Sequence, residues 1–157
     1  MNSHAKLSPS KRHRWQKCPG SVREEARYPE TRSEAAIDGT HSHTLLEWCI
    51  KNGLKDPFLL MEEKLHDHDG IFIVDEDRAE RVDFAMEYIR KRMDEIPGAT
   101  VKSETLVDLK PVTGRDDLNG TVDVQIVGGD ILEIIDYKDG MGHVPAFKNP
   151  QLEQYAF

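Results

Sequence analysis

The chain has 157 residues, of which 38% are hydrophobic and 32% charged, and its formal net charge is −8. This length suits one domain with a single core, and the composition excludes a collagen-like or membrane protein. No apolar run approaches the ~20 residues of a transmembrane helix, so we expect no membrane partner. Met1 to Ser10 contains no apolar signal core, and two cysteines, Cys18 and Cys49, suit free thiols. We therefore expect a cytoplasmic protein without a disulfide framework.

Positive charge is concentrated at the start of the chain. Residues 1–23 contain six lysines and arginines and no acid, and all 29 acidic residues follow them. The negative net charge argues mildly against a protein that binds nucleic acid by charge alone. The basic end could still contact phosphates while the acidic remainder supplies metal ligands. A solvated basic helix at a terminus would explain the same composition.

The first 97 residues are predicted to be mainly helical. Capping residues, first-turn prolines and helix-ending Pro-Gly or Gly residues mark the boundaries, and apolar residues recur at helical spacing between them. Residues 54–70 indicate only a helical turn at Asp56-Pro57 and a loop from Asp67 to Gly70. The predicted helices are Ser8 to about Pro19 with Trp15 as anchor, Val22 to Tyr28, Thr40 to Asn52, and a helix capped by Asp75 that ends at Pro97-Gly98.

After Gly98 the pattern becomes extended and then helical again. Three runs predict strands, and Asn149-Pro150 predicts a last helix that presents Gln151 and Tyr155 on one face. Helices, strands and a helix in this order predict the α/β fold class, with an α+β order along the sequence. We expect a single domain over residues 1–157, mainly helical over 1–97 and strand-rich over 98–157. The predicted strands are Thr100 to Leu109, Thr121 to Val127 and Ile131 to Lys138.

The hairpin turn decides whether two acids meet. Gly128-Gly129 predicts the turn, because glycine adopts the positive φ that such turns need. With this turn Asp123 pairs with Ile134, which places Asp136 diagonally across from Asp123 on the same face. A three-residue loop would break the alignment unless a bulge corrected it.

Asp123, Asp136 and Lys138 are the main candidates for chemistry. Lys138 lies two residues beyond Asp136 and so faces the same way along an extended chain. Two acids and an amine on one surface can hold a divalent cation and its water, as a metal-dependent phosphodiesterase requires. The acids could instead protect an edge strand from aggregation. However, Asp136 follows Ile134-Ile135 in a run typical of a buried strand, where an unpaired acid is costly.

These residues also carry a family resemblance. Gly120-Thr-Val-Asp123, Ile135-Asp-Tyr-Lys138 and the Gln151-x-x-x-Tyr155 helix resemble the RecB-like branch of the PD-(D/E)XK nuclease superfamily. Within that branch the chain is most similar to phage and prophage proteins of unknown function. The segments from Trp15 to Pro19 and from Gly39 to Glu47 resemble the two N-terminal motifs. The resemblance implies a restriction-endonuclease-like core and a Mg²⁺- or Mn²⁺-dependent deoxyribonuclease, an exonuclease of phage DNA recombination or processing.

The resemblance also implies roles for individual residues. His43, Asp123 and Asp136 would be metal ligands, and Lys138 would orient or activate the attacking water. Mg²⁺ and Mn²⁺ prefer oxygen ligands and Mn²⁺ also accepts an imidazole, which agrees with this set. Alternatively, His43 pairs with Glu47 on its helix, or His41 is the relevant histidine.

Three further residues have supporting roles by the same resemblance. Gln151 and Tyr155 would contact DNA or buttress the lysine, although they could equally be one edge of an amphipathic helix. Glu104 on the first predicted strand could add an outer-shell carboxylate.

The run His66-Asp67-His68-Asp69 could bind a transition metal, but solvated loops of this composition are commoner.

Two departures from the family pattern qualify the resemblance. Cys18 stands where some RecB-like nucleases place the first cysteine of an iron–sulfur cluster, but the chain lacks the further cysteines, so we expect no such cluster. Relatives continue beyond the last helix with another strand. We therefore expect a fragment or shortened form, or a homo-oligomer or partner chain that completes the sheet. The alternative functions are a catalytically impaired DNA-binding or interaction protein with the nuclease fold, and a metal-binding regulatory protein.

Overall fold

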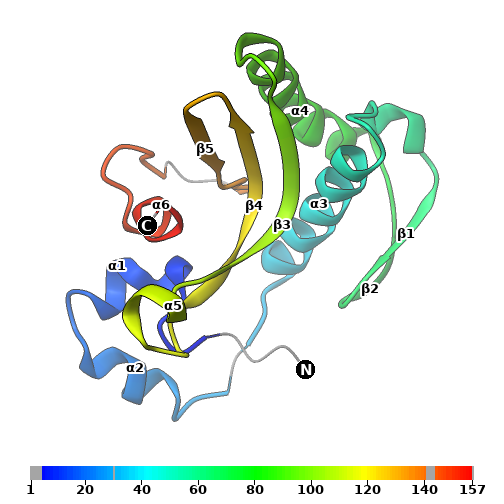
Figure 1. The fold of residues 1–157 in the computed structure, drawn as a ribbon. Helices are drawn as coiled ribbons and strands as arrows, with labels where there is room; N and C mark the ends of the chain where they lie inside the picture. The colour runs from blue at the N-terminus through cyan, green and yellow to red at the C-terminus, as the bar shows by residue number, and fades with distance from the viewer. Residues whose placement is uncertain (1–4, 30, 141–143, 157) are drawn as a thin grey trace.

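The computed structural model describes residues 5–29, 31–140 and 144–156. Short helices are followed by two long helices with a small hairpin between them, then by three strands and a final helix (Figure 1). The fold is mixed α+β, compatible with the predicted α/β class. The elements are a 3-10 turn Pro9–Lys11, α1 Arg12–Trp15, α2 Gly20–Glu25, α3 Glu34–Lys51, a 3-10 turn Pro57–Leu60, β1 Lys64–Asp67, β2 Gly70–Ile73, α4 Glu76–Glu95, β3 Thr100–Asp108, α5 Lys110–Thr113, β4 Asn119–Gly128, β5 Ile131–Ile135 and α6 Pro150–Tyr155.

Helix α3 is longer than the sequence pattern predicts. The Ser33 side chain accepts a hydrogen bond from the N–H of Ala36, and this cap starts the helix at Glu34 instead of Thr40. Gly39 lies inside the helix, where glycine is ordinarily unfavourable. The early start therefore depends on the cap and on polar contacts, among them the ion pairs of Asp38 with Arg78 and Arg81.

Two predicted caps are confirmed. The Asp75 side chain accepts a hydrogen bond from the N–H of Arg78 and starts α4. The Asn149 side chain accepts hydrogen bonds from the N–H groups of Gln151 and Leu152, which starts α6. Each cap satisfies N–H groups that have no partner inside the helix.

The core lies between α3, α4 and the antiparallel sheet β3-β4-β5. In Figure 1, α3 and α4 lie on one side of this sheet, and α6 lies on the other side with the N-terminal helices. Burial of each Val, Leu, Ile or Met side chain stabilises the fold by about 1.5–3 kcal/mol. In the described ranges no helix combines the length and apolar character needed to cross a membrane. The most buried apolar residues of this core include Leu45, Cys49, Val82, Met86, Ile89, Val124 and Ile126.

The structure contains two elements that the sequence pattern does not predict. Strands β1 and β2 form an antiparallel hairpin in the stretch interpreted as unassigned chain and loop, so the mainly helical half also contains a small sheet. Its turn is stabilised by the Asp67 side chain, which accepts hydrogen bonds from the N–H groups of Asp69 and Gly70. The short helix α5 follows β3. The last predicted strand ends at Ile135, earlier than the expected Lys138.

The predicted hairpin turn is wrong by one residue. The turn is Gly129-Asp130, because Gly128 pairs with Ile131 inside the ladder. Gly129 has the positive φ, +54°. Position 128 requires glycine for another reason. A Cβ there would lie 2.7 Å from Cγ2 of Ile96 and 2.8 Å from Cα of Ala99. Close packing at the end of α4, and not turn geometry, requires glycine at position 128.

Candidate functional site

Three carboxylates follow one another across the sheet. The β3–β4 register places Glu104 opposite Asp123, although the ladder pairing skips this pair. The β4–β5 ladder ends with Val124 opposite Ile135, so the same register places Asp136 opposite Asp123 on its other side. The predicted diagonal arrangement is therefore replaced by a direct one. Because like charges directly opposite each other destabilise a sheet, this row favours a cation nearby.

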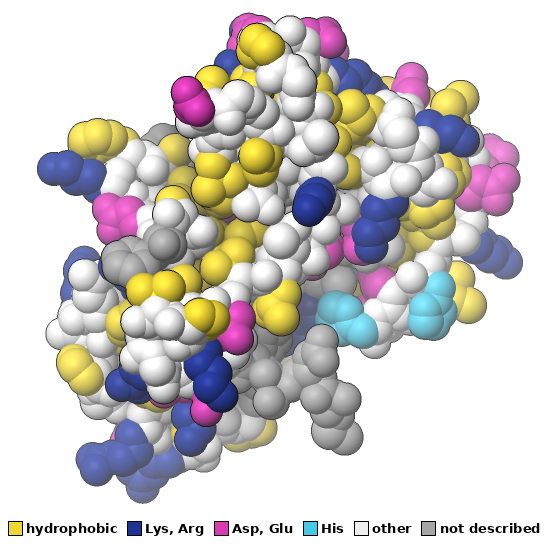
Figure 2. Space-filling model, viewed as in Figure 1, with side chains coloured by type: hydrophobic (Ala, Val, Ile, Leu, Met, Phe, Trp, Pro, Cys, Tyr) yellow, Lys and Arg dark blue, Asp and Glu magenta, His cyan; other side chains and the backbone are white. Residues whose placement is uncertain are grey.

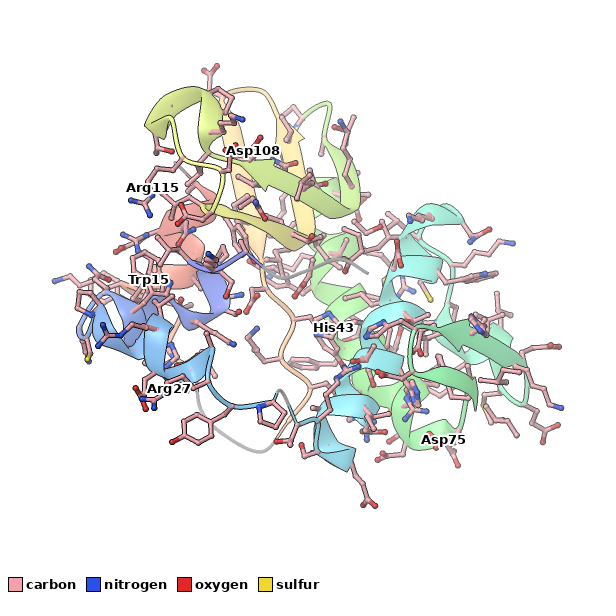
Figure 3. The ribbon with its side chains drawn as sticks, turned by 90° about the horizontal axis from the view of Figure 1, so that it is seen from below. Trp15, Arg27, His43, Asp75, Asp108 and Arg115 are labelled. Carbon is pink, nitrogen blue, oxygen red and sulfur yellow. The ribbon has the colours of Figure 1, made fainter. Side chains whose placement is uncertain are left out.

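A histidine of α3 reaches the row. His43 Nδ1 lies 3.6 Å from Asp123 Oδ1. Ligand atoms of His43, Glu104 and Asp123 all lie within 4.8 Å of one another. Figure 3 shows His43 near the middle of the molecule, with Trp15 of α1 and Arg27, which follows α2, to one side. One imidazole nitrogen with two carboxylates suits Mn²⁺, and the carboxylate oxygen atoms also suit Mg²⁺.

The segment that follows β5 fixes two members of this cluster. The N–H of Tyr137 donates a hydrogen bond of 2.8 Å to Asp123 Oδ2. The Tyr137 ring packs edge-on against His43, with ring centroids 5.2 Å apart. Burial raises the pKa of Asp123, and Asp136 raises it further, against the lowering effects of His43, Lys138 and the Tyr137 N–H. Asp123 is thus held in place while its negative charge is only partly compensated.

Glu104 is unusual in both conformation and charge. Its φ is +49°, in the left-handed region that non-glycine residues seldom adopt. Its pKa is raised to about 7, first by burial on the side that faces the protein and then by the carboxylates of Asp123 and Glu47, although part of the side chain remains in solvent. Cation binding would ionise this group and release a proton near neutral pH.

Asp136 contacts a different set of partners. Gln151 Nε2–H donates a 2.5 Å hydrogen bond to Asp136 Oδ1. Lys138 Nζ lies 2.5 Å from Asp136 Oδ2, and the Asp136 side chain is only 8% exposed. The structure thus groups Glu104 with His43 and Asp123, and it joins Asp136 to the lysine. The resemblance had implied Asp136 as a metal ligand and left Glu104 as an outer-shell carboxylate.

Tyr155 lies beside Gln151, as their shared helix face predicts. Burial raises the pKa of Tyr155 to about 12; a hydrogen bond with Gln151 lowers it, and Asp136 raises it. The tyrosine also explains the glycine that begins the Gly-Thr-Val-Asp motif. A Cβ on Gly120 would lie 2.6 Å from Pro9 Cγ and 3.1 Å from Tyr155 Cε1. Gly120 therefore lets the N-terminal turn and α6 pack together next to the site.

Comparison with known families adds membership but no activity. A family model described as "Protein of unknown function (DUF2800)" matches residues 4–157. The chain belongs to this family. No solved structure matches it. The description of the DUF2800 family names no chemistry.

In this DUF2800 chain the two histidines of α3 lie in different places. His41 stacks on Phe72 with ring centroids 4.3 Å apart, and its Nε2 lies 3.7 Å from Asp67 Oδ2. His43 instead faces Asp123. Glu47, the alternative partner of His43, forms an ion pair with Lys51. The geometry therefore selects His43 as the histidine of the site.

The histidine–aspartate hairpin forms a second group of metal-ligand type. Asp67, His68 and Asp69 have ligand atoms within 4.8 Å of one another. Arg32 already lies against this group: its guanidinium pairs with Asp69, and its Nη1 lies 2.9 Å from His68 Nε2. Because an arginine supplies the positive charge there, the geometry favours a structural role for the hairpin group.

Proposed function

We propose that this DUF2800 chain is a Mg²⁺- or Mn²⁺-dependent deoxyribonuclease with a core of the RecB-like PD-(D/E)XK type, an exonuclease of phage DNA recombination or processing. The observation that carries the proposal is the convergence of His43, Glu104 and Asp123 beside the Asp136–Lys138 ion pair. The motifs that hold these residues also resemble that nuclease branch. A helix, three antiparallel strands and a helix in this order are compatible with such a core.

The residues fit a divalent cation by their own chemistry. Two carboxylates and an imidazole lie within 4.8 Å of one another. The pKa values of Glu104 and Asp123 are raised by burial and by neighbouring carboxylates. A doubly charged ion held by His43, Glu104 and Asp123 would offset this repulsion, and oxygen-rich ligand sets select hard cations.

The reaction adds water across one P–O bond of DNA and yields a phosphate monoester and a hydroxyl. When bound, the cation would polarise the phosphate and lower the pKa of the attacking water. Lys138 stabilises the negative charge that develops on the phosphate oxygens. Asp136 orients Lys138 through their ion pair, and Gln151 fixes the second oxygen of Asp136. Tyr155 in turn holds Gln151.

The basic start of the chain supports DNA as the substrate. A cavity of about 850 Å³ is lined by cations that include Lys6 and Arg23 and by the rings of Trp15 and Tyr28. Figure 2 shows lysine and arginine side chains gathered at the lower left, over the N-terminal helices. Cations neutralise phosphates and aromatic rings stack on bases, the combination that binds single strands. Glu25 pairs with Lys11 and Arg14, two other cations of this cavity, so the net charge of the lining is positive.

The test is cleavage of end-labelled linear DNA and of circular DNA with Mn²⁺ or Mg²⁺. Wild type should degrade the linear substrate, and Asp123→Asn and Lys138→Ala should not. Lys91→Ala is the matched control, because Lys91 lies on α4 and its ammonium is 3.8 Å from Glu95, away from the site. EDTA should stop cleavage. Cleavage of the circle as well would indicate an endonuclease.

A wild type that leaves both substrates intact, or an Asp123→Asn variant that cuts as well as wild type, would overturn the proposal. DNA binding in EDTA without cleavage in any metal would instead identify the non-catalytic DNA-binding alternative. Zinc that remains bound through purification would favour the regulatory metal-binding alternative.

A further inference from the structure

We infer that Asp139, held by Arg81 of α4, is a positioning residue that fixes Lys138 beside the metal cluster. The inference rests on the proposed function for the role of Lys138, but its structural part can be tested without any activity. It depends on a charge network on the opposite side of the segment that follows β5.

Asp139 is a buried acid in a cationic setting. Its side chain is 6% exposed, and Arg81 Nε lies 2.9 Å from its Oδ1 as an ion pair whose geometry is not that of a hydrogen bond. The second oxygen, Oδ2, is buried and has no hydrogen-bond partner in the part of the chain that the structure describes. Since a buried carboxylate is costly without compensation, Arg81 supplies the main electrostatic reason for this placement.

Arg81 is itself fixed by both long helices. Its Nη2 lies 2.9 Å from Asp38 of α3, and its Nη1 pairs with Asp77 on its own helix. Asp38 also pairs with the buried Arg78. The guanidinium is therefore held from several sides before it meets Asp139. A planar group with fixed donors suits this bridging role better than an ammonium.

The backbone at Asp139 lies beside α3 at an ordinary packing distance. A Cβ on Gly39 of α3 would lie 3.7 Å from the carbonyl oxygen of Asp139. Both the side chain and the main chain at this position therefore contact the helical layer.

Alternation along the segment links this contact to the site. On one side, Asp136 contacts both Lys138 and Gln151. Tyr137 and Asp139 contact the layer of α3 and α4 on the other side, through His43 and Arg81. In an extended chain neighbouring side chains point in opposite directions. With Asp139 anchored on the helical side, Lys138 is directed toward Asp136.

A second ion pair between the same helix and the sheet provides a matched control. Arg92 Nε of α4 lies 2.7 Å from Glu133 Oε2 of β5. This pair joins α4 to β5 before the site begins, so it contributes to stability without holding the segment from Asp136 to Asp139.

The experiment compares full-length wild type with Asp139→Asn, Arg81→Lys and the control Glu133→Gln. Hydrogen exchange reports on the Tyr137 amide, and acylation with acetic anhydride, read by mass spectrometry, reports on Lys138. We expect exchange at Tyr137 to accelerate by about tenfold or more in the first two variants, through local opening. Lys138 acylation should accelerate by roughly fivefold, the factor that a partly exposed ion pair can supply. Glu133→Gln should change neither rate.

Kinetics on linear DNA at saturating Mn²⁺ provides the second measurement. Asp139→Asn should lower kcat by about 100-fold and leave KM unchanged, since displacement of a reacting group by about 1 Å has this effect. Exchange and acylation rates that stay at wild-type values in Asp139→Asn and Arg81→Lys, whatever the change in melting temperature, would overturn the inference. If wild type cuts no DNA but both rates rise as expected, the nuclease proposal fails and the positioning role stands.

Discussion

Glu104→Gln should reverse the order of stability between metal-free and metal-bound protein. In the fold the pKa of Glu104 is raised from 4.5 to about 7, first by burial and then by Asp123 and Glu47. The folded state therefore holds this proton more tightly than the unfolded chain, and wild-type stability falls as the pH rises from about 4.5 to about 7. Glutamine does not ionise, so the variant should be the more stable protein in EDTA at about pH 8.

The size of the effect follows from the pKa and from the exposure of the side chain. A rise from 4.5 to about 7 corresponds to roughly 3 kcal/mol, at ~1.4 kcal/mol for each pKa unit. Because Glu104 is partly in solvent, screening should reduce its contribution to about 1 kcal/mol. In contrast, Mn²⁺ at ~100 times its dissociation constant should stabilise wild type by about 2.7 kcal/mol. Loss of one ligand should remove most of that gain.

Urea unfolding at about pH 5 and about pH 8, in EDTA and in Mn²⁺, measures both effects. The control is Glu87→Gln, which neutralises an exposed glutamate of α4. We expect Glu104→Gln to exceed wild type only at the higher pH in EDTA and to fall below wild type in Mn²⁺. The reasoning is refuted if the variant is no more stable than wild type in EDTA at high pH. It is also refuted if Mn²⁺ raises the variant's free energy of unfolding as much as it raises that of wild type.

The remaining predictions concern the lysine, two glycines and the basic cavity. Lys138→Ala should lower kcat by about 100-fold or more with unchanged Mn²⁺ affinity, measured by single-turnover kinetics and by Mn²⁺ titration. Gly120→Ala should destabilise the protein by about 1–3 kcal/mol in urea, because its Cβ would overlap Pro9. Gly39→Ala should instead stabilise it by up to ~1 kcal/mol, since the new Cβ meets only ordinary contacts inside a helix. Arg23→Glu should weaken DNA binding in EDTA and reduce the salt dependence of that binding by about one phosphate contact. Unchanged binding would exclude the cavity as the DNA-binding surface.

Local signals identified most elements because caps and turn residues act over a few positions. Asp75 and Asn149 cap helices as predicted, since their side chains bind N–H groups close by in sequence. The hairpin register could not be predicted in the same way. Gly128 and Gly129 look alike in sequence, and only the approach of Ile96 separates the glycine that allows close packing from the one that turns.

The sequence motifs predicted part of the candidate site. His43 and Asp123 belong to motifs that resemble a known family, and the structure brings them together. The distinct roles of Glu104 and Asp136 depend on pairing between strands and on contacts with α6. Arg81 gives no sequence signal of its link to the segment after β5, because a helical arginine resembles any solvated charge. Long-range partners decide these roles, and single-residue patterns do not contain them.

The two charge systems around the segment after β5 should respond differently to perturbation. On one side, the carboxylates of Asp123 and Glu104 repel each other, and the cation that we propose would offset this repulsion. On the other side, Asp139 already has Arg81 as its counter-charge and needs no ligand. Removal of the cation should therefore loosen the cluster while leaving the Asp139 anchor intact. Removal of the anchor should loosen Tyr137, and through it both Asp123 and His43, even when the cation is present. This asymmetry follows because the Tyr137 backbone contacts the cluster directly, whereas the cluster does not contact Arg81 among the interactions that the described residues show.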